Sequence, residues 1–259
     1  MLDDIVIAKQ EEVRAAKQEV PWEDLKARLA SHLAERNFSK AISQPGKLSL
    51  IAELKRKSPS KGMLRERFDP VSLAQTLQEA GASALSVLTD EPYFGGHLDF
   101  LRDAKQFTEL PVLRKDFVID PYQVYEAAFY GADAILLIVR ILTEEQLTAC
   151  MQAADTLGLE PLLEVHSEGE LRIALSVGAH AIGINHRDLA TFQLDPTLSD
   201  QLIPKVPAGK VIVVESGVQK AEDVQRIKRL GAHAVLIGEA LMTAPDPPAK
   251  VRELFKGVW

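Results

Sequence analysis

Apolar and polar positions first form a clear pattern at residues 48–55, LSLIAELK, where an apolar run ends abruptly in charge. In a strand, residues two apart project from the same face. Ile51, Glu53 and Lys55 therefore share one face of the predicted strand. Because Ile51 is apolar, we expect this face to look inward and the strand to end in an inward acid–base pair.

The next residues, 56–62, read RKSPSKG and predict a mobile cationic loop without any buried element. In parallel-sheet enzymes the catalytic side chains lie at such a strand end, beneath a loop. The alternative is a solvated strand end with an incidental Glu–Lys pair.

A repeated pattern then runs through the chain. Segments beginning at 81, 131, 178 and 231 each start with Gly-Ala and continue into an apolar run. A glycine that closes a helical pattern is typical of a helix C-terminus. Further apolar segments begin at 110, 159 and 209. With the opening segment, the pattern predicts eight strands, each followed by a segment of helix length.

Strands that are apolar on both faces and alternate with helices indicate a parallel sheet covered on both sides. Eight such units over about 210 residues fit the α/β class of the closed (β/α)8 barrel, or TIM barrel, better than an open doubly wound sheet. No G-x-G-x-x-G follows the first strand, which argues further against a dinucleotide-binding fold.

We predict a single barrel domain over residues 1–259, with residues 1–45 as an N-terminal helical extension. Apolar residues recur at helical spacing from position 5 to position 16 and predict a surface helix. Pro21-Trp22 ends that helix, Glu23–Glu35 predicts a second one, and Gln44-Pro45-Gly46 predicts a turn before the first strand.

Composition narrows the functional classes. A net charge of −7 argues against a general nucleic-acid binder, so the basic loop is a local feature suited to a small anion. The single cysteine, Cys150, excludes an intramolecular disulfide and is expected in the core. No apolar run reaches the ~18 residues of a membrane span, and the acidic N-terminus does not resemble a signal peptide. We expect a cytoplasmic protein that does not bind membranes.

In a barrel, the carboxyl ends of the strands surround one mouth, where active sites are built. The polar side chains predicted at these ends, in chain order, are Glu53 and Lys55, Ser86, Arg114-Lys115-Asp116, Arg140, Glu164 and His166, Asn185-His186-Arg187-Asp188, Glu215-Ser216 and Glu239. Lysines and glutamates that share a pocket hold each other ionised and can exchange protons with a substrate. We interpret both histidines as loop or supporting residues, and no histidine spacing indicates a metal site.

The last two strand ends predict a phosphate site. Barrels commonly bind phosphate between the loops after strands seven and eight, through backbone N–H groups and a helix N-terminus. Ser216-Gly217 and Gly238-Glu239 supply backbone that an anion can approach closely. Ordinary turn glycines are the alternative.

These residues lie in a series of motifs: IAELKRKSPSKG, FDP at 68, VLTDEPYFGG, PVLRKDFVIDPYQVYEA, LLEVH, IGINHRDL, VESGV and LIGEALM. Taken together, in this order and over essentially the whole chain, they closely resemble the indole-3-glycerol phosphate synthase family. The resemblance implies a lyase of tryptophan biosynthesis that closes the ring of 1-(2-carboxyphenylamino)-1-deoxyribulose 5-phosphate. Its products are indole-3-glycerol phosphate, CO2 and water, and no cofactor or metal is implied.

The resemblance also implies roles for individual residues. Lys115 is the general acid at the ketone or hydroxyl oxygen, with Glu164 and Lys55 as partners in the later proton transfers. Glu53 and Asn185 position the hydroxyl and the amine. The implied binding residues are Arg187 for the carboxylate, Ser58 and the basic loop as a cover, Phe94 and Phe117 as walls for the anthranilate ring, and Glu215, Ser216, Gly217, Gly238 and Glu239 around the phosphate.

Two positions depart from the family pattern. His186 stands where the family usually has Asn, and the last loop reads GEALM instead of GSSLM or GESLM. We expect Glu239 to offer its backbone N–H to the phosphate and to turn its carboxylate away, because two anions repel.

Three other functions compete with this interpretation. A phosphate-binding barrel isomerase, such as a phosphoribosylanthranilate-isomerase-like enzyme, would use an Asp or Cys acid–base pair. A Schiff-base aldolase would form an imine on a lysine. A non-catalytic phosphate-ligand binder would lack many of the charged residues at the strand ends. The predicted partner is a phosphorylated small molecule bound by a monomer, with contacts to other tryptophan-pathway enzymes left open.

Overall fold

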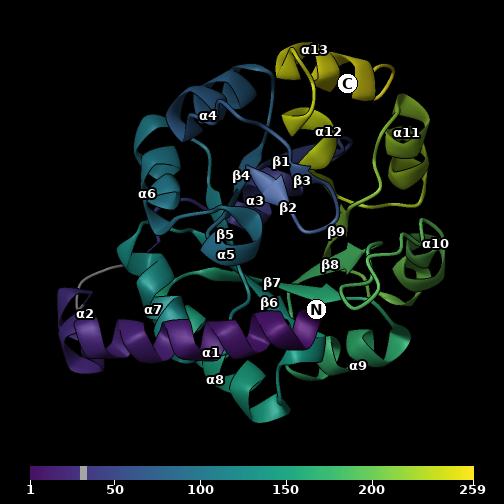
Figure 1. Ribbon diagram of the computed structural model, residues 1–259. Helices are drawn as coiled ribbons and strands as arrows, with labels where there is room; N and C mark the ends of the chain where they lie inside the picture. The colour runs from purple at the N-terminus through teal and green to yellow at the C-terminus, as the bar shows by residue number, and fades with distance from the viewer. Residues whose placement is uncertain (30–33) are drawn as a thin grey trace.

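The computed structural model describes residues 1–29 and 34–259, and its centre is a closed barrel of eight parallel strands (Figure 1). These strands are β1 (Ser49–Leu54), β4 (Ala84–Leu88), β5 (Val112–Lys115), β6 (Ala134–Ile138), β7 (Glu160–Val165), β8 (Ala181–Asn185), β9 (Val211–Glu215) and β10 (Ala234–Ile237). Each strand pairs with its neighbours in the chain, and β1 closes the barrel against β10. The predicted fold class is confirmed.

Helices surround the barrel and alternate with its strands (Figure 1). The longer ones are α4 (Pro70–Glu79), α6 (Leu98–Phe107), α7 (Pro121–Phe129), α8 (Glu144–Leu157), α9 (Glu168–Ser176), α11 (Ala221–Arg229) and α13 (Pro247–Leu254). Shorter turns are α5 (Glu91–Phe94), η1 (Val139–Ile141), α10 (Leu198–Leu202), η2 (Ile203–Lys205) and α12 (Glu239–Met242). Asp69, Asp120 and Asp246 each cap a helix whose first residue is Pro, which satisfies free N–H groups where the strand-to-helix loop ends.

The N-terminal extension differs from the prediction. The first helix, α1 (Leu2–Glu19), is as expected, but α2 (Trp22–Arg28) stops well before Glu35. Residues 30–33 of the predicted second helix lie outside the described residues, and residues 34–36 are not helical. A third helix, α3 (Phe38–Ile42), was not predicted. It is only five residues long, too short to leave a periodic pattern, and Asn37 caps it.

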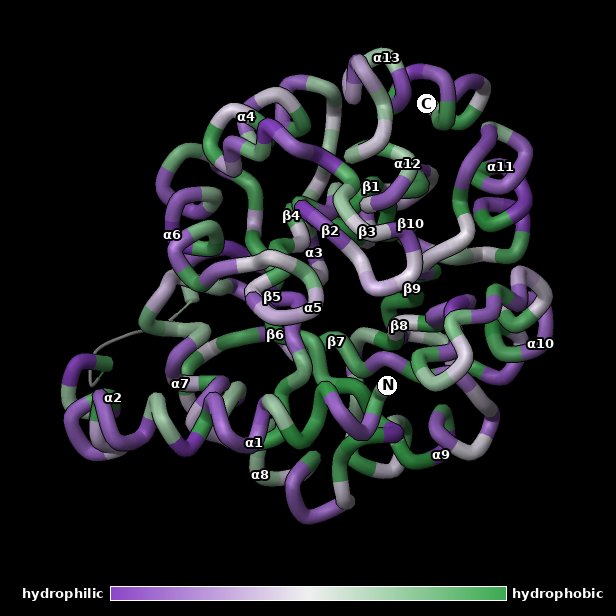
Figure 2. Tube along the Cα trace, viewed as in Figure 1, coloured by the Kyte–Doolittle hydropathy of each residue, from purple (hydrophilic) through white to green (hydrophobic). Residues whose placement is uncertain are grey.

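Two layers of apolar side chains build the core. Inside the barrel, Ile51, Leu113 and Leu136 belong to one cluster, which Phe38 and Ile42 of α3 join. The backbone N–H of Ser39 donates to Glu160 at the start of β7, so α3 closes the amino end of the barrel. The larger cluster lies between strands and helices and includes Cys150, as predicted. Figure 2 accordingly shows hydrophobic residues concentrated in the central strands and hydrophilic ones on the outer helices.

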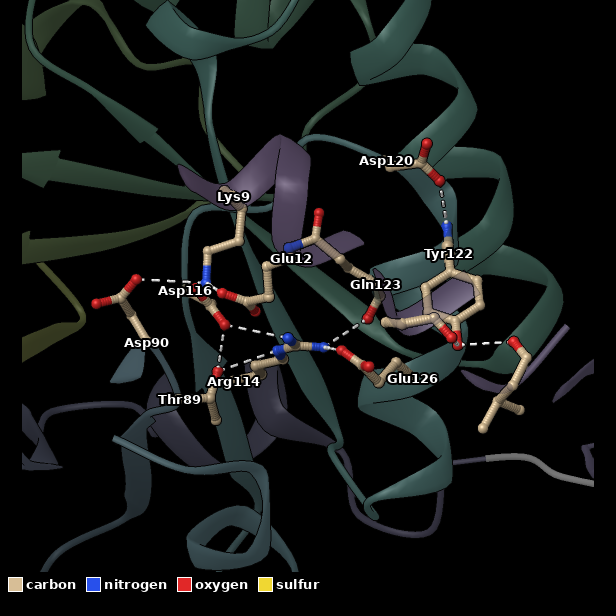
Figure 3. Close-up of polar contacts among 12 residues, drawn as sticks. Lys9, Glu12, Thr89, Asp90, Arg114, Asp116, Asp120, Tyr122, Gln123 and Glu126 are labelled. Atoms are coloured by element: carbon tan, nitrogen blue, oxygen red, sulfur yellow. Dashed lines mark hydrogen bonds and ion pairs between the residues drawn. The ribbon is translucent and has the colours of Figure 1, made fainter. Parts of the chain in front are cut away.

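A buried ionic network joins α1 to the carboxyl end of the barrel (Figure 3). The Lys9 side chain is only 1% exposed, and its Nζ lies 2.9 Å from Asp116 Oδ1 and 3.3 Å from Asp90 Oδ2. Asp116 also accepts a hydrogen bond from Arg114, which is fully buried. Burial alone would raise the pKa of Asp116, but the Lys9 and Arg114 cations lower it below its ordinary value.

Candidate active site

All fourteen predicted site residues line one cavity of about 930 Å³ at the carboxyl ends of the strands. They are Glu53, Lys55, Ser58, Phe94, Lys115, Phe117, Glu164, Asn185, Arg187, Glu215, Ser216, Gly217, Gly238 and Glu239. Leu136, Ile138 and Leu236 line the same cavity and also belong to the barrel's inner cluster. The site is therefore a deep pocket with an apolar base and charged walls, a common form of small-molecule site.

Lys115 lies between two glutamates in this pocket. Its Nζ donates to Glu164 Oε2 at 3.1 Å and lies 3.5 Å from Glu215 Oε2. Burial alone would lower the pKa of Lys115, but the carboxylates of Glu164 and Glu215 raise it well above its ordinary value. Lys115 is consequently a protonated ammonium at neutral pH.

The two glutamates titrate very differently. Burial alone would raise the pKa of Glu164, but Lys115 and His166 lower it, so this carboxylate is ionised. Burial raises the pKa of Glu215, and the neighbouring Glu164 carboxylate raises it further. Lys115 lowers it in part, and the pKa of Glu215 is about 8. Neither Glu215 oxygen has a hydrogen-bond partner within residues 1–29 and 34–259. The pocket therefore holds one charged and one largely protonated carboxyl beside the same ammonium.

Glu53 and Lys55 form the predicted inward pair at the end of β1. Their Oε2 and Nζ atoms lie 2.6 Å apart, and Glu53 is buried. A glycine makes room for each inner carboxylate. A Cβ on Gly238 would collide with Glu53 Oε2, and a Cβ on Gly183 would collide with Glu215 Oε1.

The end of β8 orients two further groups. The Asn185 side-chain oxygen accepts from the Arg187 backbone N–H at 3.0 Å, which fixes the turn after the strand. Arg187 Nη2 reaches across the pocket to Glu239 Oε2 at 3.3 Å. The Glu239 carboxylate thus turns toward Arg187, with Lys61 3.9 Å away. This ion pair was not predicted, because it joins residues 52 apart in sequence.

The loops after β9 and β10 have uncommon backbone conformations at the predicted phosphate residues. Ser216 and Gly217 both have positive φ angles, 64° and 77°. Positive φ is uncommon for serine and costs backbone energy, so the surrounding fold enforces it. Gly238 precedes the short helix α12, which begins at Glu239. Successive N–H groups in such loops form concave sites that suit anions.

The basic loop is more ordered than predicted. Residues Lys57–Ser58 (β2) and Gly62–Met63 (β3) pair as a short antiparallel hairpin. Ser58 is buried and its hydroxyl accepts from the Lys61 backbone N–H at 3.3 Å, while the rest of the loop is exposed or half-buried. Next to this hairpin, the Phe94 and Phe117 rings lie 6.0 Å apart between centroids and form an aromatic wall.

Sequence reasoning missed some residues of the pocket wall. Leu189, Phe192 and Leu194 follow β8 and line the cavity. They could not be predicted, because apolar residues scattered through a polar loop form no periodic pattern. Within the described ranges, no group of three or more His, Cys, Asp and Glu side chains is arranged to hold a metal ion. Over the same ranges, no helix combines the length and apolar character needed to cross a membrane.

The fold and the pocket define a (β/α)8-barrel enzyme whose mouth is equipped for acid–base chemistry. Comparison with known proteins identifies the family. The family model described as indole-3-glycerol phosphate synthase matches residues 2–254. The chain belongs to the indole-3-glycerol phosphate synthase family, and it is an enzyme of the carbon–carbon lyase class in tryptophan biosynthesis.

Curated relatives agree with this assignment. The indole-3-glycerol phosphate synthase of Caldanaerobacter subterraneus is 45% identical over 258 residues, covering 100% of this chain and 98% of the relative. That of Carboxydothermus hydrogenoformans is 45% identical over 253 residues, covering 95% and 96%. Among solved structures, 3-hexulose-6-phosphate synthase from Salmonella typhimurium has a TM-score of 0.64 at 16% identity, covering 80% of this chain and 96% of that one. This last likeness concerns the fold alone.

Proposed function

We propose that the pocket performs the family reaction with Lys115 as its central acid. The substrate is 1-(2-carboxyphenylamino)-1-deoxyribulose 5-phosphate, and the products are indole-3-glycerol phosphate, CO2 and water. The observation that carries the proposal is the Lys115 ammonium, held 3.1 Å from Glu164 and 3.5 Å from Glu215 within one pocket. An acid placed in this way can protonate a ketone oxygen while its charge stays balanced.

Ring closure is the first step. The aromatic carbon that bears the carboxylate attacks the ketone carbon, and the oxygen takes a proton from Lys115. Loss of CO2 leaves its bonding electrons in the ring and restores aromaticity. The Phe94–Phe117 wall, with its 6.0 Å centroid separation, supports an aromatic ring at this place.

Dehydration completes the reaction. The hydroxyl formed in the first step leaves as water, which requires a proton on that oxygen and loss of one from the adjacent carbon or nitrogen. Glu164 and Lys55 are proposed for these transfers, while Glu53 and Asn185 position the hydroxyl and the amine. The 2.6 Å contact between Glu53 and Lys55 supports a shared function for that pair.

The anionic ends of the substrate have separate proposed sites. Arg187 faces the carboxylate, and the loops with Ser216, Gly217 and Gly238 receive the phosphate. Glu239 contributes its backbone N–H, since its carboxylate is occupied by Arg187. Ser58 and the hairpin loop cover the mouth, which excludes water and strengthens the electrostatic interactions inside.

A fluorescence assay tests the reaction directly. Purified protein is mixed with the carboxyphenylamino-deoxyribulose phosphate, without added metal or nucleotide, and the fluorescence of the indole-3-glycerol phosphate product is followed. The wild type forms indole-3-glycerol phosphate, and Lys115→Met lowers kcat by about 10²–10⁴-fold, the usual contribution of a general acid. Absence of this product with the wild type refutes the reaction.

Two controls separate the competing functions. A product from phosphoribosylanthranilate, with none from the carboxyphenylamino substrate, identifies an isomerase. Borohydride trapping of substrate on Lys115 identifies a Schiff-base enzyme, since only an imine is reduced to a stable adduct.

We further propose that residues 1–259 fold as one domain, which acts as a cytoplasmic monomer. The buried contact of Lys9 with Asp116 supports joint folding of residues 1–45 with the barrel. Contacts with other enzymes of the tryptophan pathway are a proposal of the same kind. Sedimentation of the purified protein measures the oligomeric state.

A further inference from the structure

Charged side chains of alternating sign form a chain that leads away from Lys115. Lys115 contacts Glu164, Glu164 contacts His166, and His166 contacts Glu170. Beyond them, Arg140 donates to Glu170 and to Asp188. Of these six residues only Lys115 and Glu164 line the pocket, so the other four act on a substrate through their neighbours, if at all.

His166 is the link between the pocket and the outer part of this chain. Its side chain is 3% exposed and lies between two carboxylates from different elements. Nδ1 is hydrogen-bonded to Glu170 Oε2 at 3.1 Å, whereas Nε2 lies 3.2 Å from Glu164 Oε1 as an ion-pair contact without hydrogen-bond geometry. Glu170 is itself fixed, because it also accepts the His166 backbone N–H at 2.8 Å and both Nε and Nη2 of Arg140.

The two carboxylates favour the charged form of the ring. A neutral imidazole has a single N–H, so one of its nitrogens would carry a lone pair beside a carboxylate. Only the imidazolium carries an N–H on both nitrogens, one at ion-pair distance from Glu164 and one within hydrogen-bond distance of Glu170. Arg140 on η1 is a cation near the ring from the adjoining element, and its charge is balanced by Glu170 and Asp188.

We propose that the imidazolium of His166 is a positioning residue that holds Glu164 ionised and directed at Lys115. Glu164 has two oxygens, and Lys115 uses only one of them, Oε2. His166 faces the other, so the carboxylate is held from both sides. This inference rests on the proposed roles of Lys115 and Glu164, and it adds a group that is absent from the proposed mechanism.

The electrostatics agree with the geometry. Burial alone would lower the pKa of His166, but Glu164 and Glu170 raise it to about 9. His186 provides a contrast within the same protein, since burial and Arg226 lower its pKa to about 4. At neutral pH the two buried histidines therefore have opposite charge states.

Nitrogen NMR of histidine-labelled wild-type protein tests the charge state without any substrate. At about pH 8 an ordinary histidine is largely neutral. His166 is expected to show both ring nitrogens protonated there, while His186 shows one. The His166 signals are assigned by their loss in His166→Gln. A neutral His166 at this pH overturns the proposal, whatever reaction the enzyme catalyses.

Kinetics test the consequence for Glu164. His166→Gln keeps an N–H near Glu164 but removes the charge, so kcat at neutral pH falls while KM stays close to that of the wild type. The wild-type kcat is expected to fall as pH rises through about 9, and the variant loses this change. Coincident profiles of the two proteins overturn the proposal.

Two further variants keep the test decisive if His166→Gln folds poorly. Glu170→Gln retains the ring and removes one carboxylate. His166 should therefore lose its second ring proton at a lower pH than in the wild type, and kcat should begin to fall at that lower pH. His180→Gln, at an exposed histidine before β8, is the matched control and should leave both readouts unchanged. An unchanged kcat profile in Glu170→Gln contradicts the proposal.

Discussion

The Nζ atom of Lys9 lies 2.9 Å from Oδ1 of Asp116, and both side chains are almost fully buried. Asp116 directly follows Lys115 in the sequence, so the N-terminal helix is tied to the strand end that carries the proposed acid. Arg114 and Lys115 alternate in direction, as a strand requires, with Arg114 in the network and Lys115 in the pocket. Asp116, directly after β5, belongs to the network and also lines the pocket.

Lys9→Met should strongly destabilise the protein. The change leaves Asp116 and Asp90 buried beside one fewer cation, and removal of one partner from a buried ion pair typically costs about 3–5 kcal/mol. The free energy of unfolding from urea titration measures this loss. Lys17→Met is the matched control on the same helix, because the Lys17–Asp120 pair is partly exposed and is expected to contribute less than about 1 kcal/mol. Equal losses in the two variants would contradict the assigned importance of burial.

The barrel and the pocket could be predicted because their signals are local. Each strand has its own apolar run and glycine boundary, and barrel topology then brings the strand ends together. Lys115 and Glu164 are 49 residues apart, yet both were predicted for one mouth, since each ends a strand. The positions of all eight strands were correct for the same reason.

The features that were missed depend on contacts between distant segments. Lys9 lies among Glu and Gln in a helical pattern that is typical of a surface helix, and nothing local indicates that Asp90 and Asp116 bury it. His166 was interpreted as a supporting residue, but its two carboxylate contacts were not foreseen. Charge pairing across elements leaves no periodic trace, which is why sequence alone could not show these networks.

Gly183→Ala should impair catalysis without disturbing the phosphate loops. A Cβ at position 183 collides with Glu215 Oε1, so the carboxyl group has to move away from Lys115. We expect a lower kcat, with phosphate affinity, measured by titration of inorganic phosphate, close to that of the wild type. Gly169→Ala adds the same methyl group with only an ordinary contact to Ser167, and it should leave kcat unchanged. A fully active Gly183→Ala would refute the need for Glu215 at its present position.

The stability of Glu215→Gln relative to the wild type should depend on pH. The pKa of Glu215 is raised from 4.5 to about 8, so the folded state retains a proton that the unfolded state releases. Its contribution to stability is fully present below about pH 4.5 and is lost as pH rises through about 8. Glutamine stays neutral at every pH. As pH rises through this range, the free energy of unfolding of the variant should therefore increase relative to that of the wild type by on the order of 1–3 kcal/mol.

Urea unfolding at a series of pH values, without substrate, measures this difference. Glu222→Gln, at an exposed position of α11, is the control, and its stability relative to the wild type should change little with pH. If the two variants behave alike, then Glu215 does not retain its proton in the folded protein.

Arg187 and Glu239 should affect substrate binding in opposite directions. The Arg187 guanidinium is paired with Glu239 at 3.3 Å, so the substrate carboxylate that we propose binds Arg187 has to compete for it. Arg187→Ala removes a charged hydrogen bond worth about 1.5–3 kcal/mol, and KM should rise roughly tenfold or more. Glu239→Ala keeps the backbone N–H for the phosphate but removes the competitor, so KM should fall. Steady-state kinetics of both single variants and of the double variant measure the coupling. Because Glu239 acts through Arg187, its substitution should have no effect once Arg187 is absent, and independent effects would show that the two side chains bind different groups.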